Sequence, residues 1–125
     1  LRCDGVIIYP RFLSIAEMDE IVSQHRQPIL VINRRLRRND SYCIFSDQHA
    51  AGAAAVAHLI ARGCSRIAFL GDASSHYPEF RDRYAGLSDV LREAGHAVDP
   101  GLHVDALSTE QSGYEAASRL IGAAA

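Results

Sequence analysis

The sequence predicts an α/β fold in which helices cover a parallel β-sheet, and three observations lead to this prediction. Short apolar runs alternate along the chain with segments of helical periodicity, which is the pattern of parallel sheets. The run from Cys43 to Gly71 contains a whole strand–helix–strand unit, and its second strand, 67–70, is continuously apolar, as a strand covered on both faces should be. Polar and glycine-containing loops follow the apolar runs, where such sheets bind ligands.

The first part of the chain is expected to form strands around one helix and one polar loop. Ser14 can cap a helix that runs through His25, because Glu17 completes a capping box and apolar residues recur behind it at helical spacing. The loop from Asn33 to Ser41 is rich in arginine. Buried strands are expected at 4–9, 29–32 and 42–45.

The second part is expected to alternate helices with further strands. Residues 50–57 are only alanine, glycine and valine, so the helix that contains them can pack closely on whatever it covers. Gly63 and Gly95 each follow the end of an expected helix, where glycine is common. The helices start after Asp47, at Pro78, and at Ser108 or Thr109, and the strands are 66–70 and 102–106.

The composition limits the classes of function. The chain has 125 residues, about the length of one domain, and its net charge of −2 gives no reason to expect that this segment itself binds nucleic acid. No apolar run approaches the roughly 20 residues that span a bilayer. The cysteines and histidines lack the spacing of metal ligands, so we expect buried or half-buried free thiols in a reducing compartment, no metal and no cofactor. The catalytic motifs that we looked for are missing, which favours a binding protein over an enzyme.

Ligands of parallel sheets bind at the carboxyl ends of the strands, and this rule predicts a candidate surface. A basic cluster, Arg34, Arg35, Arg37 and Arg38, belongs to one of its loops. We favour a solvated loop over a phosphate or nucleic-acid site for this cluster, because no aromatic residues are interleaved with it. The segments of the candidate surface are 9–13, 33–35, 45–47, 71–79 and 107–110.

Short strings spread along the whole chain carry a resemblance to a known family. They are Tyr9 to Ser14, Gln27 to Asn39, Asp47-Gln48, Gly52, His58-Leu59-Ile60, Gly63, Arg66 to Gly71, Arg83-Tyr84-Ala85-Gly86 and Ser112-Gly113-Tyr114. Together they resemble the ligand-binding core of the LacI/GalR family of bacterial transcription repressors. The first two strings are similar to the subgroup that includes the repressor of the cryptic β-glucoside (arbutin, salicin, cellobiose) operon.

The resemblance implies a periplasmic-binding-protein-like fold, in which two lobes bind a small molecule, usually a sugar, between them and thereby change operator affinity. Residues 1–45 would be part of the N-terminal lobe and 46–125 part of the C-terminal lobe. The helix-turn-helix headpiece that binds operator DNA would lie outside this chain, which we expect to be a fragment of a longer protein. The resemblance also implies a cytoplasmic homodimer that does not contact a membrane.

Two other functions remain open at this point. A periplasmic sugar-binding receptor for transport or chemotaxis would share the fold, and an enzyme with a flavodoxin-like sheet would share the alternation of strands and helices. A signal peptide upstream would indicate the receptor, and a helix-turn-helix would indicate the repressor. The free cysteines and the closer match of the strings favour the repressor.

The resemblance implies effector contacts at Arg83 and Asn33. The guanidinium of Arg83 has a fixed fork of donors that can bind two adjacent oxygens, and the alternative is a solvated ion pair with Asp82 or Glu79. The amide of Asn33 can both donate to and accept from a sugar hydroxyl, and the alternative is a simple turn residue.

The other effector contacts that the resemblance implies are Phe45, Asp47, Tyr77, Glu79 and Ser108. Phe45 would be a stacking surface or part of the core, and Asp47 would be a contact or only a helix cap. Tyr77 would stack on a pyranose ring and Glu79 would accept hydrogen bonds from hydroxyl groups, the alternative for both being a mobile surface loop. Ser108 stands where the subgroup tends to have an aromatic residue, and a serine cannot provide a stacking platform. Gln48 departs from the usual Asn, and no function is assigned to it.

Overall fold

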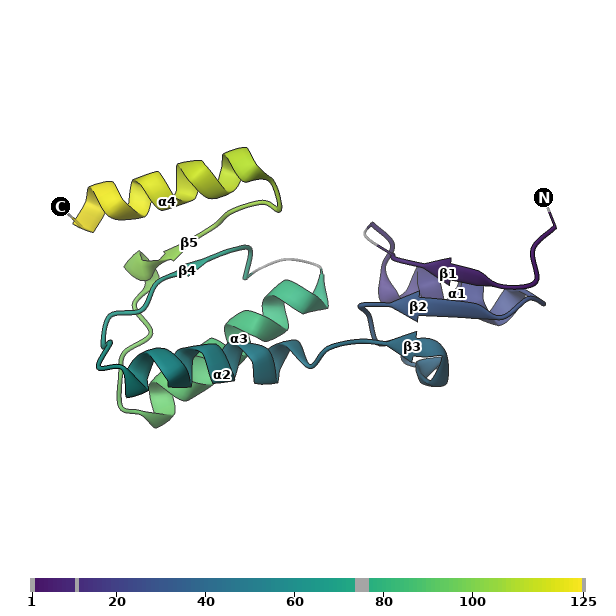
Figure 1. Cartoon of the computed structure of the whole chain (residues 1–125), viewed down its shortest axis with the longest axis horizontal. Helices are drawn as coiled ribbons and strands as arrows, with labels where there is room; N and C mark the ends of the chain where they lie inside the picture. Colours follow the sequence, from purple (N-terminus) through teal and green to yellow (C-terminus); the bar gives the residue numbers. More distant parts are fainter. Residues whose placement is uncertain (1, 11, 74–76, 125) are drawn as a thin grey trace. The chain divides into compact units, whose positions relative to one another are not determined.

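The computed structural model describes residues 2–10, 12–73 and 77–124 (Figure 1). The chain divides into two compact units, residues 1–47 and 48–125. Within the described ranges every strand pair is parallel, and the strands form one sheet of order β1-β2-β3 and another of order β4-β5. The predicted α/β class with parallel sheets is therefore confirmed, with one sheet in each unit.

In the first unit, α1 (Ile15–Gln24) covers one face of a sheet of short strands (Figure 1). The β1 and β2 strands pair with Val6 opposite Ile29, and β2 and β3 pair with Val31 opposite Cys43. The strands are β1 (Val6–Ile8), β2 (Ile29–Ile32) and β3 (Cys43–Ile44), and a 3-10 turn, η1 (Asp40–Tyr42), precedes β3.

Helix α1 begins as the sequence predicts. The Ser14 side chain accepts a hydrogen bond from the Glu17 N–H at 3.2 Å, and the Glu17 carboxylate accepts one from the Ser14 N–H at 2.8 Å. This capping box satisfies backbone donors that the start of a helix leaves unpaired. The hydrogen bond from the Ser14 N–H also lowers the pKa of the Glu17 carboxyl.

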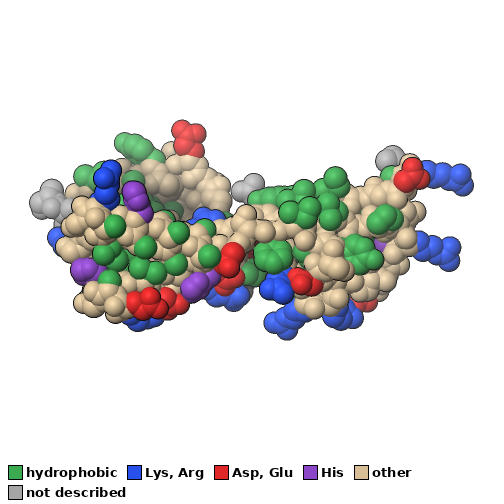
Figure 2. All heavy atoms as spheres, turned by 60° about the horizontal axis from the view of Figure 1, so that its bottom comes forward, with side chains coloured by type: hydrophobic (Ala, Val, Ile, Leu, Met, Phe, Trp, Pro, Cys, Tyr) green, Lys and Arg blue, Asp and Glu red, His purple; other side chains and the backbone are tan. Residues whose placement is uncertain are grey.

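The two faces of the first sheet differ in burial. Paired residues of a parallel ladder point to the same side, so the register divides the strands into two alternating sets. One set packs in the core with Met18, Val22 and Leu36, and its members are Val6, Ile8, Ile29, Val31 and Cys43. The other set faces away from α1 and includes Ile7 and Ile44, which are 69% and 59% exposed. The expectation that these strands are buried is therefore wrong for one face of the sheet, and Figure 2 shows apolar side chains at the surface of both units.

In the second unit, three helices accompany a two-stranded sheet (Figure 1). Phe69 pairs with His103 and Leu70 pairs with Val104. The predicted strands 66–70 and 102–106 are therefore present, but the paired segments are shorter than expected. The elements are α2 (Gln48–Ala61), β4 (Phe69–Leu70), α3 (Pro78–Glu93), η2 (Pro100–Leu102), β5 (His103–Val104) and α4 (Glu110–Ala124).

Apolar residues of α2 and α3 form the core of the second unit. The buried members are Val56, Leu87 and Leu91. Tyr84 of α3 reaches the sheet, because its ring centre lies 5.1 Å from that of Phe69 and 4.7 Å from that of His103. These ring contacts are worth about 0.5–1.5 kcal/mol each beyond the area that they bury, and they fix α3 on the β4–β5 sheet.

Helices α2 and α3 end at the glycines that the sequence indicates. Gly63 has a φ of 86° and Gly95 a φ of 78°, both in the left-handed region. Beyond α2, the Cys64 N–H donates to the Leu59 carbonyl at 3.0 Å, and the residue after Gly95 makes the corresponding bond at 2.8 Å. This is the Schellman pattern, which satisfies carbonyls that the last turn of a helix leaves free.

Candidate functional site

The predicted site residues fall on both units. Each of them lies just beyond a strand, just before a helix or in the first two turns of one. Asn33, Phe45 and Asp47 belong to the first unit, and Tyr77, Glu79, Arg83 and Ser108 belong to the second. That all of them contribute to one effector site stays a prediction.

Asn33 follows β2 and has a φ of 62°. This left-handed conformation is costly for most residues, and asparagine tolerates it better than other residues with a side chain. The Asn33 N–H donates to the Ile44 carbonyl at 2.7 Å, and its Nδ2 donates to the Tyr9 hydroxyl oxygen at 3.2 Å. Asn33 is therefore a turn residue by its backbone, and its amide is joined to a residue that follows the neighbouring strand.

Phe45 follows β3 and is 43% exposed, so the interpretation that it belongs to the core is wrong. The guanidinium carbon of Arg35 lies over its ring, 5.4 Å from the centre, which is a cation–π distance. Asp40 holds Arg35 through two hydrogen bonds of 2.8 and 3.2 Å, and this contact raises the pKa of Arg35. The ring thus stacks against an arginine of its own unit.

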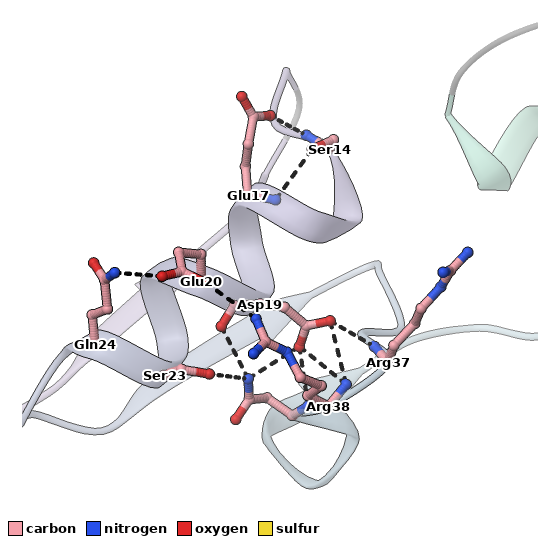
Figure 3. A network of polar contacts seen from close by, with 9 residues as sticks. Ser14, Glu17, Asp19, Glu20, Ser23, Gln24, Arg37 and Arg38 are labelled. Carbon is pink, nitrogen blue, oxygen red and sulfur yellow. Dashed lines mark hydrogen bonds and ion pairs between the residues drawn. The ribbon is translucent and has the colours of Figure 1, made fainter.

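A buried carboxylate fixes the arginine-rich loop (Figure 3). Asp19 of α1 is 3% exposed, and its oxygens accept hydrogen bonds from the backbone N–H groups of Arg37, Arg38 and Asn39 at 3.0, 3.2 and 3.1 Å. The Asn39 Nδ2 adds a further bond at 3.0 Å. Burial by itself would raise the pKa of Asp19, but the hydrogen bonds from Arg38, Asn39 and Arg37 together lower it. We call this arrangement the Asp19 clamp.

The arginines of the basic cluster have different surroundings, so the solvated-loop interpretation holds for only part of it. Arg34 is 4% exposed, and its Nη1 donates to the Leu13 carbonyl, which contradicts that interpretation. Arg38 pairs with Glu20 at 3.3 Å. Arg37 is exposed, and its side chain points away from the Asp19 clamp in Figure 3. The cluster is therefore largely engaged in contacts within the first unit.

Arg83 lies in the second turn of α3, and its guanidinium binds an amide. Its Nε and Nη2 both donate to Oε1 of Gln48, at 3.1 and 2.6 Å. The sequence makes Asp82 a candidate ion-pair partner of Arg83. In the structure, Oδ1 of Asp82 lies 4.0 Å from Nε of Arg81. The structure thus gives Arg83 a neutral partner on α2 in place of the ion pair with Asp82.

Two glycines set the position of the Arg83 backbone. A Cβ at Gly52 of α2 would lie 2.1 Å from the Arg83 carbonyl oxygen, and one at Gly86 of α3 would lie 2.0 Å from the His49 carbonyl oxygen. Each glycine therefore receives the backbone of the other helix, and a side chain at either position would push the helices apart. The prediction that residues 50–57 allow close packing is confirmed. We call this contact the glycine crossing, and it brings Arg83 beside the first turn of α2, where Gln48 lies.

The other predicted residues of the second unit lie at helix starts. Tyr77 is the N-cap residue of α3, and its ring centre lies 6.3 Å from that of Phe80 in an edge-to-face arrangement. Glu79 is half-buried in the first turn of α3, so the alternative of a surface loop is wrong for this residue. Ser108 is exposed in the link between β5 and α4. Positions 11 and 74–76 of the predicted surface lie outside the described residues.

Sequence reasoning gave no role to three residues that hold predicted site residues or the arginine-rich loop. Tyr9 lay within the predicted surface but was not singled out as a partner of Asn33. No sequence pattern could have indicated the role of Gln48, because its contact with Arg83 depends on the glycine crossing. The sequence could have indicated the role of Asp19, because this residue lies between Met18 and Val22 on the buried stripe of α1, where a carboxylate needs hydrogen-bond donors.

Several expectations concern features of the chain as a whole. In the described ranges, no three His, Cys, Asp or Glu residues gather closely enough to hold a metal ion, and no helix is long and apolar enough to cross a bilayer. All three cysteines are free. Cys43 is half-buried as expected, whereas Cys3 and Cys64 are exposed, so the expectation of burial is wrong for these two.

The chain is similar in sequence to bacterial regulators. The family model of the periplasmic binding protein-like domain matches residues 56–125. The HTH-type transcriptional regulator AscG of Escherichia coli (strain K12) is 43% identical over 121 residues, which cover 97% of this chain and 36% of that protein. The HTH-type transcriptional regulator GalR of the same strain is 30% identical over 97% of this chain and 35% of that protein.

A solved structure is similar to the chain in its backbone as well. The crystal structure of a sugar-binding transcriptional regulator of the LacI family from Escherichia coli, complexed with phosphate, superimposes with a TM-score of 0.84 at 42% identity. The match covers 98% of this chain and 44% of that one. The chain thus spans less than half the length of the regulators that it matches.

Proposed function

The chain belongs to the family of periplasmic-binding-protein-like domains that LacI/GalR-type regulators contain, and we propose that it is part of the effector-binding core of such a transcriptional repressor. The observation that carries this proposal is the 43% identity with the regulator AscG over 97% of the chain. We assign residues 1–45 to the N-terminal lobe of that core and residues 46–125 to the C-terminal lobe. The division of the chain into two compact units supports this assignment, although the boundary between the units lies two residues later, after Asp47.

The proposed effector is a sugar or a glycoside. Its hydroxyl groups can donate and accept, and the amide of Asn33 can do both in return. The guanidinium of Arg83 can bind two adjacent oxygens. Tyr77, the N-cap residue of α3, and Glu79, in the first turn of that helix, precede Arg83 and would add an aromatic face and an acceptor. These groups suit an uncharged polyol, and Phe45, Asp47 and Ser108 are the remaining proposed contacts.

Regulation would follow from a difference in affinity between two conformations of the core. An effector that binds one conformation more tightly shifts the population toward it, and the conformation sets the affinity of the headpieces for operator DNA. A ligand with equal affinity for both conformations would bind without regulating. The proposed partners are therefore the effector, operator DNA through a headpiece outside this chain, and a second copy of the protein, all in the cytoplasm.

The alternative of a periplasmic sugar-binding receptor is not favoured. Such a receptor would share the fold, but the relatives that match nearly the whole chain are transcriptional regulators. The same relatives favour a function without catalysis.

The substitution Arg83→Ala in the full-length protein tests the proposal. Operator affinity is measured by fluorescence anisotropy in the presence of salicin, arbutin and cellobiose. We expect at least one sugar to change the operator affinity of the wild type. Arg83→Ala should need at least about tenfold more of that sugar, because hydrogen bonds to a charged group are worth about 1.5–3 kcal/mol. The matched control is Arg92→Ala, which removes an exposed arginine from the last turn of the same helix. An unchanged response of Arg83→Ala would refute the assignment of the site.

A further inference from the structure

The contact between Arg83 and Gln48 leaves one edge of the guanidinium open. The Nε and Nη2 atoms of Arg83 both donate to a single acceptor, Gln48 Oε1, at 3.1 and 2.6 Å. A guanidinium carries five N–H donors, so three remain, and two of these lie side by side on the edge formed by Nη1 and Nη2. Within the described ranges, Arg83 makes no other hydrogen bond.

The open edge suits a ligand with two adjacent oxygens. The N–H groups of Nη1 and Nη2 are nearly parallel and bind such a pair bidentately. Neighbouring hydroxyl groups of a sugar ring present two oxygens in this way. Because Gln48 is a neutral amide, the charge of Arg83 stays uncompensated by this partner, and its hydrogen bonds to a ligand keep the strength of charge-assisted bonds.

The placement of Gln48 makes it suited to fix this geometry before a ligand binds. Arg83 is exposed, and a long exposed side chain populates many rotamers that binding must restrict. Gln48 is half-buried in the first turn of α2, and the glycine crossing at Gly52 and Gly86 sets the distance from that turn to α3. A guanidinium already held along one edge loses less freedom when the other edge binds.

We propose that Gln48 is a positioning residue for the effector. It acts through Arg83, by holding the Nε edge of the guanidinium so that the Nη1–Nη2 edge is presented to two adjacent hydroxyl oxygens of a sugar ring. The inference rests on the proposed function, because it requires Arg83 to contact the effector.

The test compares sugar affinities of four variants of the full-length protein by isothermal titration with salicin, arbutin and cellobiose. Gln48→Met keeps the length and helix propensity of the side chain and removes the amide oxygen. Gln48→Glu keeps an oxygen acceptor for the Nε edge. The third variant is Arg83→Ala, and the fourth combines it with Gln48→Met. Gln111→Ala removes an exposed glutamine of α4 and serves as the control.

We expect Gln48→Met to bind the sugar about tenfold more weakly, equivalent to about 1.4 kcal/mol, with an unchanged melting temperature. Gln48→Glu keeps the acceptor but compensates the charge of Arg83, so its affinity should lie between those of Gln48→Met and the wild type. Adding Gln48→Met to Arg83→Ala should weaken binding no further. If Arg83→Ala weakens binding and Gln48→Met does not, or if the two effects add, Gln48 is not a positioning residue. If Arg83→Ala binds like the wild type, or the wild type binds none of the three sugars, the proposed function and this inference both fail.

Discussion

The glycine crossing predicts that one exchange of glycine for alanine destabilises the protein while a matched exchange stabilises it. In a helix interior, alanine is favoured over glycine by about 1 kcal/mol. At Gly52 this gain is opposed, because the new Cβ would lie 2.1 Å from the Arg83 carbonyl oxygen. That oxygen belongs to a helix backbone and cannot rotate away, so α2 and α3 must separate. Overpacking of this kind typically costs about 1–3 kcal/mol, so after the gain in helix propensity we expect Gly52→Ala to be destabilised by up to about 2 kcal/mol net.

The control is Gly113→Ala in α4, where nothing lies within 4 Å of an added Cβ. We expect the free energy of unfolding of this variant to rise by about 0.5–1 kcal/mol, because alanine has the higher helix propensity and its Cβ meets no other atom there. Urea unfolding followed by circular dichroism gives the free energy of unfolding of both variants and of the wild type. If Gly52→Ala gained as much stability as Gly113→Ala, the helices would not approach each other as closely as described, and the placement of Arg83 beside Gln48 would lose its basis.

Two further predictions concern the first unit. Asp19→Asn weakens the Asp19 clamp and should lower the free energy of unfolding at pH 7 by about 2 kcal/mol. Because folding lowers the pKa of Asp19, the advantage of the wild type should be complete above pH of about 4 and shrink as the pH falls further. Urea titrations at neutral and acid pH measure this gap, and a gap that does not shrink in acid would contradict the linkage. Asn33→Gly should preserve stability, because glycine accepts a φ of 62°, whereas Asn33→Ala should lose about 1 kcal/mol relative to it. Both variants lack the amide, so we expect them to lose the same amount of sugar affinity. Their melting temperatures should differ, and equal melting temperatures would argue against the left-handed backbone at this position.

Local sequence signals predicted the elements well and their lengths less well. Ser14 with Glu17, and Gly63 and Gly95, mark helix ends that the structure contains, because capping depends on residues within one turn of each other. Strand lengths depend on a partner elsewhere in the chain. The apolar run at 66–70 therefore indicates a strand. Its length in the structure depends on which of its residues pair with β5, and these are Phe69 and Leu70.

The contacts of the site residues were harder to foresee than their positions. The rule for parallel sheets placed Asn33 at a strand end, and the family resemblance pointed to Arg83 near the start of a helix. It could not show that Arg83 binds Gln48, because their 35-residue separation is closed only by the crossing of two helices. Arg34 illustrates the same limit: a run of arginines indicates a solvated loop, and only the fold shows that one of them is buried against the Leu13 carbonyl.

The Asp19 clamp has a consequence for proteolysis of this protein. Trypsin cleaves after arginine, and Arg35, Arg37 and Arg38 offer it closely spaced peptide bonds on an exposed segment. A protease must draw the backbone out of its folded conformation before it can cut. The clamp ties the N–H groups of this segment to a helix that lies 18 to 20 residues earlier in the chain. Nicking at these arginines would therefore report the moments at which this segment is released from Asp19.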